Sequence, residues 1–492
     1  MKFLFIFKSV EWLGVEYLSA ALKKAGHETD LAFESGLGGT FYFKLKKSDH
    51  QEIFEKINSF KPDMILFSCT TNIFPWVKEV AAGIKRRFNI PIMVGGIHPT
   101  IIPEKVIEDK NIDIVCIGEG EEAIVELANK IENNQPYFKT KNFWFKSEGK
   151  IIKNPLRPMI KDLDSLPFPD KDIFYKYGCF TDRIYVMTTR GCPYKCTYCF
   201  NHQLQKIYEG TKSCYVRRRS INSVIEELKF FKRRYNAKSV HFYDDTFILD
   251  SKWVMEFCKV YKKEINLPFY CLIRANLVTE ELISALKYAG CKSVGMGLES
   301  GNSDIRNKVL KRNMTAEQII NASRIVKKHK IELVTFNIFG FPDETPKQML
   351  DTMKLNLKIK PSALFTYVFY PFYGTDLMKE ALEKGYIDPK TVELIISGDG
   401  DYQSSSMLKH PYKKEAYNMK VILPLLNKLP KTFHRFFLKK WVFQKNPDYL
   451  IKMIKVFSIP FYSGWESKQR FKEQLSMMLQ SKYPHKKKNI RL

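Results

Sequence analysis

The stretch Thr189–Phe200, which reads TRGCPYKCTYCF, decides how the rest of the chain is interpreted. It carries three cysteines at C-x3-C-x2-C spacing, and the apolar, β-branched run 184–189 leading into them predicts a strand. A structural zinc site takes four Cys or His ligands, but only His202 follows closely and the chain has no second C-x2-C pair. Three thiolates on a short loop instead suit a 4Fe–4S cluster in which one iron stays open to another ligand.

The loop, with the aromatic Tyr198 before its last cysteine, resembles the C-x3-C-x-aromatic-C motif of the radical S-adenosylmethionine (SAM) superfamily. The resemblance implies that Cys192, Cys196 and Cys199 hold the cluster and that SAM chelates the fourth iron. It also implies an external electron donor of the flavodoxin or ferredoxin type, and a 5′-deoxyadenosyl radical that abstracts hydrogen from an unactivated C–H bond. The alternative is a loop of free or zinc-binding cysteines.

Length and composition are those of a globular protein. The 492 residues allow two or three domains, and 45% apolar with 27% charged residues is an ordinary balance. The seven cysteines outside the loop are scattered, mostly in apolar runs, which favours buried thiols in a reducing compartment. The N-terminal run Phe3–Phe7 is too short for a signal peptide and no apolar run reaches membrane-spanning length, so we expect a cytoplasmic protein.

Residues 1–135 alternate between strand-like and helix-like patterns, which predicts a doubly wound parallel α/β sheet. The expected strands are 2–7, 29–33, 64–68, 92–95 and 112–117. The expected helices are 15–25, 51–60, 75–88 and 121–131. In such sheets a ligand binds outside the carboxyl ends of the strands. Polar residues and glycines stand at the ends of three of these strands, namely Ser68, Thr70, Gly95, Gly96, His98, Gly118 and Glu119.

At these positions the domain resembles the cobalamin-binding domains that precede many radical SAM cores. The resemblance rests on an LG-x2-YL helix start, a VGG-x-HP turn and a GEGE turn. It implies that Ser68 and Thr70 lie near the nucleotide tail of cobalamin and that Gly95 and Gly96 lie along it. The D-x-H-x2-G loop of many corrinoid proteins is absent, as in many radical SAM relatives, so cobalt would have no protein histidine beneath it. The alternatives are a flavodoxin-like domain without corrinoid and, for His98, a turn histidine held by hydrogen bonds.

A linker is expected at residues 136–182. Segments 142–145 and 150–153 flank Ser147-Glu148-Gly149 and predict a hairpin. The proline-rich, acidic segment 162–169 cannot continue a helix or a central strand, so we expect it to strap the first domain onto the second.

Residues 183–395 predict six strand–helix units, which indicates a partial (β/α)6 barrel of the TIM type. The expected strands are 184–189, 239–242, 269–273, 293–298, 333–339 and 363–370. The expected helices are 220–234, 252–264, 280–289, 316–329 and 346–359. Radical SAM cores are barrels of this kind, and barrel enzymes place their chemistry at the carboxyl ends of the strands.

The resemblance assigns SAM contacts to residues at these strand ends. It implies that Asp244 and Asp245 hold the SAM amino group, while Arg274 and Glu299 lie at its ribose and carboxylate. The remaining implied contacts, all at the adenine, are Gly340, Pro342 and the backbone of Tyr198. The family's G-x-P-G-E-T pattern is changed here to G-F-P-D-E-T, so the turn after the fifth strand is expected to differ. The alternative for the paired aspartates is capping of the next helix.

The C-terminal region, residues 396–492, is predicted to be helical at 414–423, 433–443 and 449–457, with a kink or break at Pro424 and Pro430. From Lys409 onward it holds about 20 basic and 4 acidic residues, so most of the formal charge of +27 lies here. A helical cap with a solvated lysine face is the first interpretation. A peripheral contact with anionic lipid and an anionic or lipid-linked substrate are the alternatives; no nucleic-acid recognition motif accompanies the charge.

Together these features predict a cobalamin-dependent radical SAM enzyme that methylates an unactivated carbon of an unknown small molecule. A cyclase or rearrangement catalyst with the same cofactors, and a binding module without turnover, are the alternatives. A methylthiotransferase would need three cluster cysteines in the first domain, which has only Cys69 and Cys116.

Overall fold

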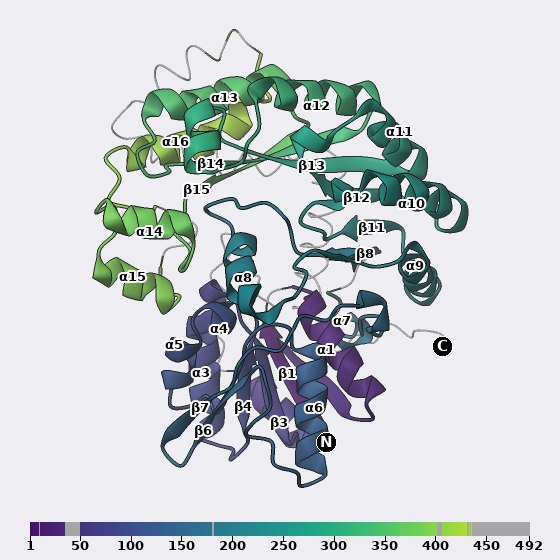
Figure 1. Ribbon diagram of the computed structural model, residues 1–492, viewed down its shortest axis with the longest axis vertical. Helices are drawn as coiled ribbons and strands as arrows, with labels where there is room; N and C mark the ends of the chain where they lie inside the picture. The colour runs from purple at the N-terminus through teal and green to yellow at the C-terminus, as the bar shows by residue number, and fades with distance from the viewer. Residues whose placement is uncertain are drawn as a thin grey trace.

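Two α/β domains are stacked along the long axis of the molecule, with the N-terminal domain below and the barrel above in Figure 1. The computed structural model describes residues 1–8, 10–34, 50–179, 182–400 and 406–430, together with residues 432 and 434. Each domain has its own buried apolar core. Among the described residues no helix is both long and apolar enough to cross a bilayer.

The first domain is a sheet with helices on both faces, as the alternating pattern predicts. Its parallel strands are β1 (Lys2–Lys8), β2 (Glu28–Glu34), β3 (Met64–Ser68), β4 (Ile92–Gly95) and β5 (Ile114–Cys116). Its helices are α1 (Leu13–Lys24), α2 (Gln51–Phe60), α3 (Phe74–Lys85), α4 (Ile97–Ile101), α5 (Pro103–Glu108) and α6 (Glu121–Glu132). The strand order β2-β1-β3-β4-β5 reverses between β1 and β3, so a ligand crevice is expected beyond the carboxyl ends of these two strands.

Two segments of this domain differ from the sequence-based interpretation. The expected hairpin forms as β6 (Phe143–Ser147) and β7 (Lys150–Lys153), but it also pairs antiparallel with β5 and so extends the first sheet to seven strands. The VGG-x-HP segment, expected as a turn, continues into helix α4. The helix tolerates Pro99 because this residue lies in the first helical turn, where a backbone N–H has no intrahelical acceptor.

The linker is anchored on the first domain by a buried charge cluster. Lys171, which is 1% exposed, lies just before α7 (Asp172–Tyr175). Its Nζ donates to Glu11 Oε1 at 2.7 Å and to Glu16 Oε2 at 2.8 Å on α1. Because removing one partner would leave a buried charge uncompensated, this cluster fixes where the chain leaves the first domain.

The second domain is a six-stranded parallel sheet in the order β15-β14-β13-β12-β11-β8, which confirms the partial barrel. Its strands are β8 (Arg183–Val186), β11 (Ser239–Phe242), β12 (Phe269–Ile273), β13 (Cys291–Glu299), β14 (Glu332–Phe339) and β15 (Ala363–Val368). Helices on its outer side are α9 (Ile221–Tyr235), α10 (Ser251–Glu264), α11 (Glu280–Ala289), α12 (Ala316–Lys328) and α13 (Pro346–Ile359). Capping boxes at Thr315 and Thr345 fix where α12 and α13 begin.

Helix α8 (Phe200–Tyr208) follows the cysteine loop and lies between the two domains (Figure 1). The loop is framed by a short two-stranded ribbon of β9 (Thr189–Arg190) and β10 (Arg217–Arg218). The last described helices are α14 (Asp376–Glu383), α15 (Pro389–Ile396) and α16 (Lys413–Leu426). Apart from residue 434, the predicted helices 433–443 and 449–457 fall outside the described residues.

Of the kink or break predicted at Pro424, the break is wrong, because α16 continues through this residue to Leu426. A proline removes the N–H that would bind the carbonyl four residues earlier, which here is that of Lys420. The Thr366 hydroxyl of β15 donates to this carbonyl at 2.7 Å. The acceptor is therefore satisfied by a neighbouring strand, and the helix tolerates the proline.

Candidate functional site

A cavity of about 700 Å³ lies between the two domains, in the size range of cofactor sites. From the first domain it is lined by residues that follow the strands: Trp12, Gly14, Ser68, Gly95, Gly96, Gly118 and Glu119. From the second domain it is lined by Thr189, Arg190 and Gly191 of the cysteine loop, and by barrel residues including His241, Tyr243, Asp245, Tyr270 and Phe336. The carboxyl ends of both sheets therefore open onto one space.

The cysteine loop carries three free thiols, with Cys196 buried and Cys192 and Cys199 half-buried. Hydrogen-bond donors approach two of the sulfurs, Arg274 Nη1 at 4.0 Å from Cys196 Sγ and Asn201 Nδ2 at 4.0 Å from Cys199 Sγ. Burial raises the pKa of Cys192, and that of Cys199 to about 12. Thiolates at these positions consequently need a cationic partner.

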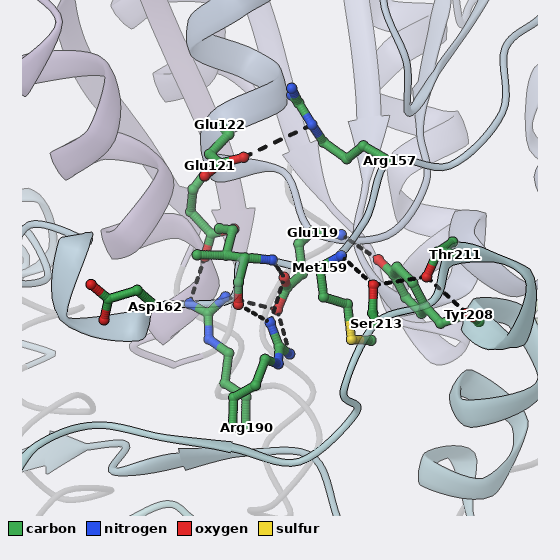
Figure 2. A network of polar contacts seen from close by, with 12 residues as sticks. Glu119, Glu121, Glu122, Arg157, Met159, Asp162, Arg190, Tyr208, Thr211 and Ser213 are labelled. Atoms are coloured by element: carbon green, nitrogen blue, oxygen red, sulfur yellow. Dashed lines mark hydrogen bonds and ion pairs between the residues drawn. The ribbon is translucent and has the colours of Figure 1, made fainter.

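An ion-pair network between the domains forms one wall of the cavity (Figure 2). The Glu119 carboxylate accepts two hydrogen bonds from Arg217, each 2.8 Å, and one from Arg190 Nη1 at 3.1 Å. It also accepts the Ile160 N–H at 2.9 Å, while Glu121 accepts from Arg190 Nη2 at 2.6 Å. Burial opposes ionisation of Glu119, but the hydrogen bonds and charges of the two arginines outweigh it and hold its pKa below the ordinary value.

Glu119, which the resemblance places at the cofactor, takes part in this network. Glu119 does line the cavity, yet its carboxylate is engaged by β9 and β10 of the barrel. Sequence reasoning missed Arg190 and Arg217. Arg190 stands two residues before Cys192 in the loop already singled out, and Arg217 begins a run of three arginines that was not considered.

A tight backbone contact joins the same turn to α8. The Glu119 N–H donates to Tyr208 Oη at 2.9 Å. Gly118, at φ +75°, lies so close to this ring that a Cβ there would stand 2.1 Å from Tyr208 Oη. Only glycine fits, so the GEGE turn is shaped to receive the helix that follows the cysteine loop.

Three of the residues assigned to SAM meet around one buried arginine. Arg312 Nη1 donates to Tyr198 Oη at 2.6 Å and lies 3.6 Å from Glu299 Oε1. Arg274 donates to the Arg312 carbonyl, and its guanidinium lies 3.6 Å from the centre of the Tyr194 ring. Burial raises the pKa of Glu299 although Arg312 opposes it. The group packs beside Cys196 rather than on the cavity wall.

The two aspartates after β11 differ in environment. Asp244 is fully buried and accepts from the Thr188 hydroxyl at 2.6 Å and from the Thr188 N–H at 3.2 Å. It thereby holds the end of β8, from which the cysteine loop departs. Asp245 opens onto the cavity and is the better placed of the two to meet a ligand ammonium.

The G-F-P-D-E-T turn keeps a backbone shape that suits glycine. Asp343, which stands where the family pattern has glycine, adopts φ +61°, a region that aspartate tolerates better than most residues. The Glu344 carboxylate accepts the Gly340 N–H at 2.7 Å and the Phe341 N–H at 3.2 Å. Burial raises the pKa of Glu344 to about 8 although these bonds oppose it. Gly340 and the buried Pro342 therefore belong to a turn closed by its own glutamate.

Two residues assigned to cobalamin lie apart from the lining of the cavity. Thr70 donates to Asn72 Oδ1 at 2.7 Å. His98, 1% exposed, has Nδ1 3.2 Å from Thr71 Oγ1 and its ring 4.6 Å from that of Phe74. Burial lowers its pKa to about 4, so it is neutral at pH 7. This is the environment of a turn histidine held by its neighbours.

The residues present fit both cofactor types. Among the described side chains no three of the His, Cys, Asp or Glu class converge on a single metal ion. Three thiolates that each bind a different iron of a cluster need no such convergence, and the donors near Cys196 and Cys199 suit bound sulfur. The glycine-lined, largely apolar cavity at the switch point of the first sheet suits a bulky ring.

Comparison with known proteins finds two family models. Residues 186–355 match the radical SAM superfamily and residues 7–128 match the B12 binding domain. An uncharacterised methyltransferase from Pyrococcus horikoshii is 30% identical over 379 residues, covering 75% of this chain and 78% of that protein. The anaerobic magnesium-protoporphyrin IX monomethyl ester cyclase of Rubrivivax gelatinosus is 24% identical and covers 92% and 79%.

Among solved structures, the fold resembles the radical SAM methyltransferase TsrM from Kitasatospora setae, a structure with cobalamin and a 4Fe–4S cluster bound. The TM-score is 0.68 at 14% identity, and the match covers 98% of this chain and 99% of that one. At this identity the likeness concerns the fold.

Proposed function

Since the chain belongs to the cobalamin-binding radical SAM superfamily, we propose that this enzyme transfers a methyl group to an unactivated carbon of a small molecule. The observation that carries the proposal is the single cavity onto which the first sheet, the cysteine loop and the barrel all open. Methyl transfer to carbon needs a methyl donor and a hydrogen-abstracting radical at the same substrate, and one shared space meets that need.

When bound, the cluster and SAM supply the radical and cobalamin supplies the methyl carrier. The role of the chain is to hold and orient these groups. Cys192, Cys196 and Cys199 would bind three irons, with Arg274 and Asn201 donating toward their sulfurs. Ser68, Gly95 and Gly96 would lie along the corrinoid at the strand ends.

Asp245, facing the cavity, would accept from the SAM ammonium. The interdomain wall would exclude water from the reacting groups. An external one-electron donor of the flavodoxin or ferredoxin type would reduce the cluster.

The second candidate is cyclisation or rearrangement with the same cofactors. It is favoured by the similarity to the magnesium-protoporphyrin cyclase, which extends over 92% of this chain. Methyl transfer is preferred because the relative with the higher identity is named a methyltransferase.

Anaerobic reconstitution separates these functions. The protein, loaded with iron, sulfide and cobalamin, is reduced and given SAM with a deuterated methyl group and candidate substrates. A methyltransferase yields S-adenosylhomocysteine, 5′-deoxyadenosine and a product that carries the trideuterated methyl group in place of one substrate hydrogen. Release of 5′-deoxyadenosine without S-adenosylhomocysteine would favour the cyclase, and release of neither would overturn both.

The cluster assignment has its own control. Cys196→Ala should abolish 5′-deoxyadenosine formation, whereas Cys214→Ala, at an exposed cysteine outside the loop, should leave it at the wild-type rate. Equal activity of the two variants would contradict the assignment of Cys196 to the cluster.

A further inference from the structure

A buried cation lies beside the cysteine loop without an anionic partner. Arg274 directly follows β12 and is 6% exposed. Among the described residues its guanidinium forms no ion pair with a carboxylate, and its buried Nε has no hydrogen-bond acceptor. The carboxylate of this region, Glu299, lies 3.6 Å from Arg312 Nη1 instead. Because a buried charge is costly unless an opposite charge compensates it, the surroundings of Arg274 suit an anion.

The contacts that Arg274 makes direct it toward the cysteine loop. Its Nη1 lies 4.0 Å from Cys196 Sγ. The guanidinium also lies 3.6 Å from the centre of the Tyr194 ring, and Nη2 donates to the Arg312 carbonyl. A guanidinium is planar and rigid, so stacking on one side and a hydrogen bond on another fix the direction of the remaining N–H groups. The charge of Arg274 is thereby held beside the sulfur of Cys196.

The donors at the other two cysteines of the loop are neutral. Asn201 Nδ2 lies 4.0 Å from Cys199 Sγ. The backbone N–H of Tyr194 and the hydroxyl of Thr246 bond to the sulfur of Cys192. Among these described donors Arg274 is therefore the one that carries a charge. Three thiols would give this charge no counter-ion, whereas three thiolates on a cluster would.

From this arrangement we infer that Arg274 is an electrostatic partner of the cluster, whose buried charge stabilises the reduced form and so raises the reduction potential. The potential of an iron–sulfur cluster depends on its net charge and on hydrogen bonds to its sulfurs. The reduced cluster carries one more negative charge than the oxidised cluster, so a fixed cation beside Cys196 favours reduction.

The inference rests on the cluster assignment in the proposed function and goes beyond it. It also departs from the contact with SAM that the resemblance implies for Arg274. The guanidinium is held between Tyr194 and the Arg312 carbonyl, and Arg274 does not line the cavity between the domains. If its role is toward the cluster, its effect on the potential should be present before SAM binds.

The test is a redox titration of the full chain, loaded with cluster and cobalamin, in the absence of SAM. Low-temperature electron paramagnetic resonance measures the reduced cluster at each solution potential, apart from the signal of cobalamin. At a fixed potential, Arg274→Gln should lower the ratio of reduced to oxidised cluster about tenfold, as expected for loss of a hydrogen bond to a charged group. For a one-electron couple this is a shift of about 59 mV to a more negative potential. Arg274→Lys keeps the charge and should recover most of the ratio.

Lys311→Gln is the matched control, because it removes one positive charge next to Arg312 in the chain. Lys311 is exposed, so solvent screens its charge and the variant should keep the wild-type ratio. The iron and sulfide content of each variant shows that the cluster is present. Equilibrium dialysis of the oxidised proteins measures their affinity for SAM separately.

An unchanged ratio in Arg274→Gln, with weaker binding of SAM, would overturn the inference and assign Arg274 to SAM. An equal shift in Lys311→Gln would also overturn it, because the effect would then be one of overall charge. If Arg274→Gln holds no iron, Tyr194→Leu replaces it. This variant keeps the charge but removes the ring that fixes the guanidinium, so the ratio should fall, and an unchanged ratio would contradict the inference.

Failure of the proposed function has different signs. Wild-type protein that binds no iron would refute the cluster assignment, and absence of S-adenosylhomocysteine after reduction would refute methyl transfer. Neither is the readout of the redox titration, so the failures are distinguishable.

Discussion

The Glu119 carboxylate should be the strongest single link between the two domains, and Glu119→Gln tests this. Both of its oxygens are engaged, by Arg217 twice at 2.8 Å, by Arg190 at 3.1 Å and by a backbone N–H at 2.9 Å. An amide keeps only one acceptor and turns its own N–H groups toward a guanidinium. Arg217, whose side chain is 7% exposed, would then retain its charge without an anionic partner in this network.

Removing one partner of a buried ion pair costs about 3–5 kcal/mol. Because Arg190 keeps Glu121 at 2.6 Å, we place the loss at the lower end, about 3 kcal/mol. For domains of this size, that corresponds to a decrease in unfolding temperature of about 6–12 °C. Scanning calorimetry of the reconstituted protein measures the shift, and the cobalamin retained after gel filtration measures its effect on the cavity.

Glu122→Gln, at the start of helix α6 that follows Glu119 in the chain, is the control. The Glu122 carboxylate lies 4.0 Å from Arg157 Nε and is 54% exposed, so its loss should cost at most about 1 kcal/mol. Loss of the exposed Glu122 pair alone should shift the unfolding temperature by about 2 °C or less. If the two variants unfold within about 2 °C of each other and retain equal cobalamin, the interdomain role of Glu119 is refuted.

Three further predictions concern the barrel. Glu344 has an ordinary pKa of 4.5 and a folded pKa of about 8, so the native state holds a proton that the unfolded chain releases between these values. Stability should therefore fall as pH rises from 4.5 to 8, by at most about 1.4 kcal/mol per pH unit, and Glu344→Gln should flatten the slope in urea titrations at several pH values. Asp343 adopts φ +61°, so Asp343→Ala should be about 1 kcal/mol less stable than Asp343→Gly in the same titration, since both lose the same side-chain contacts; equal stability would contradict a left-handed turn. Thr366→Val should leave the Lys420 carbonyl without its donor and cost about 1–2 kcal/mol, whereas no loss would show that the helix does not depend on this bond.

Local pattern predicted most of the fold. The strands 64–68, 92–95, 239–242 and 269–273 were expected with the bounds that the structure shows, because apolar runs broken by amphipathic helices leave little choice of element. The pairing of the hairpin with β5 was not predicted, because a hairpin's own residues do not specify which edge it joins. The helix through Pro424 was missed for a related reason, since its compensating donor lies 54 residues away.

The candidate site was likewise predicted only in part from the sequence. The cysteine loop could be recognised because its three cysteines stand within eight residues of one another. Glu119 was noticed for its turn, but its partners Arg190 and Arg217 lie 71 and 98 residues further on, beyond any local pattern. Charge pairing across domains depends on how the domains dock, so only the three-dimensional arrangement assigns it.

The addition of β6 and β7 to the first sheet changes how the protein can be divided. A fragment ending at residue 135 would leave the edge of β5 bare, with its backbone N–H and C=O groups open to another chain. Such a piece should self-associate, whereas one extending past Lys153 carries its own edge protection. Anyone isolating the corrinoid-binding half for spectroscopy should therefore cut after the hairpin, because the boundary of the folding unit lies beyond the boundary suggested by the last helix.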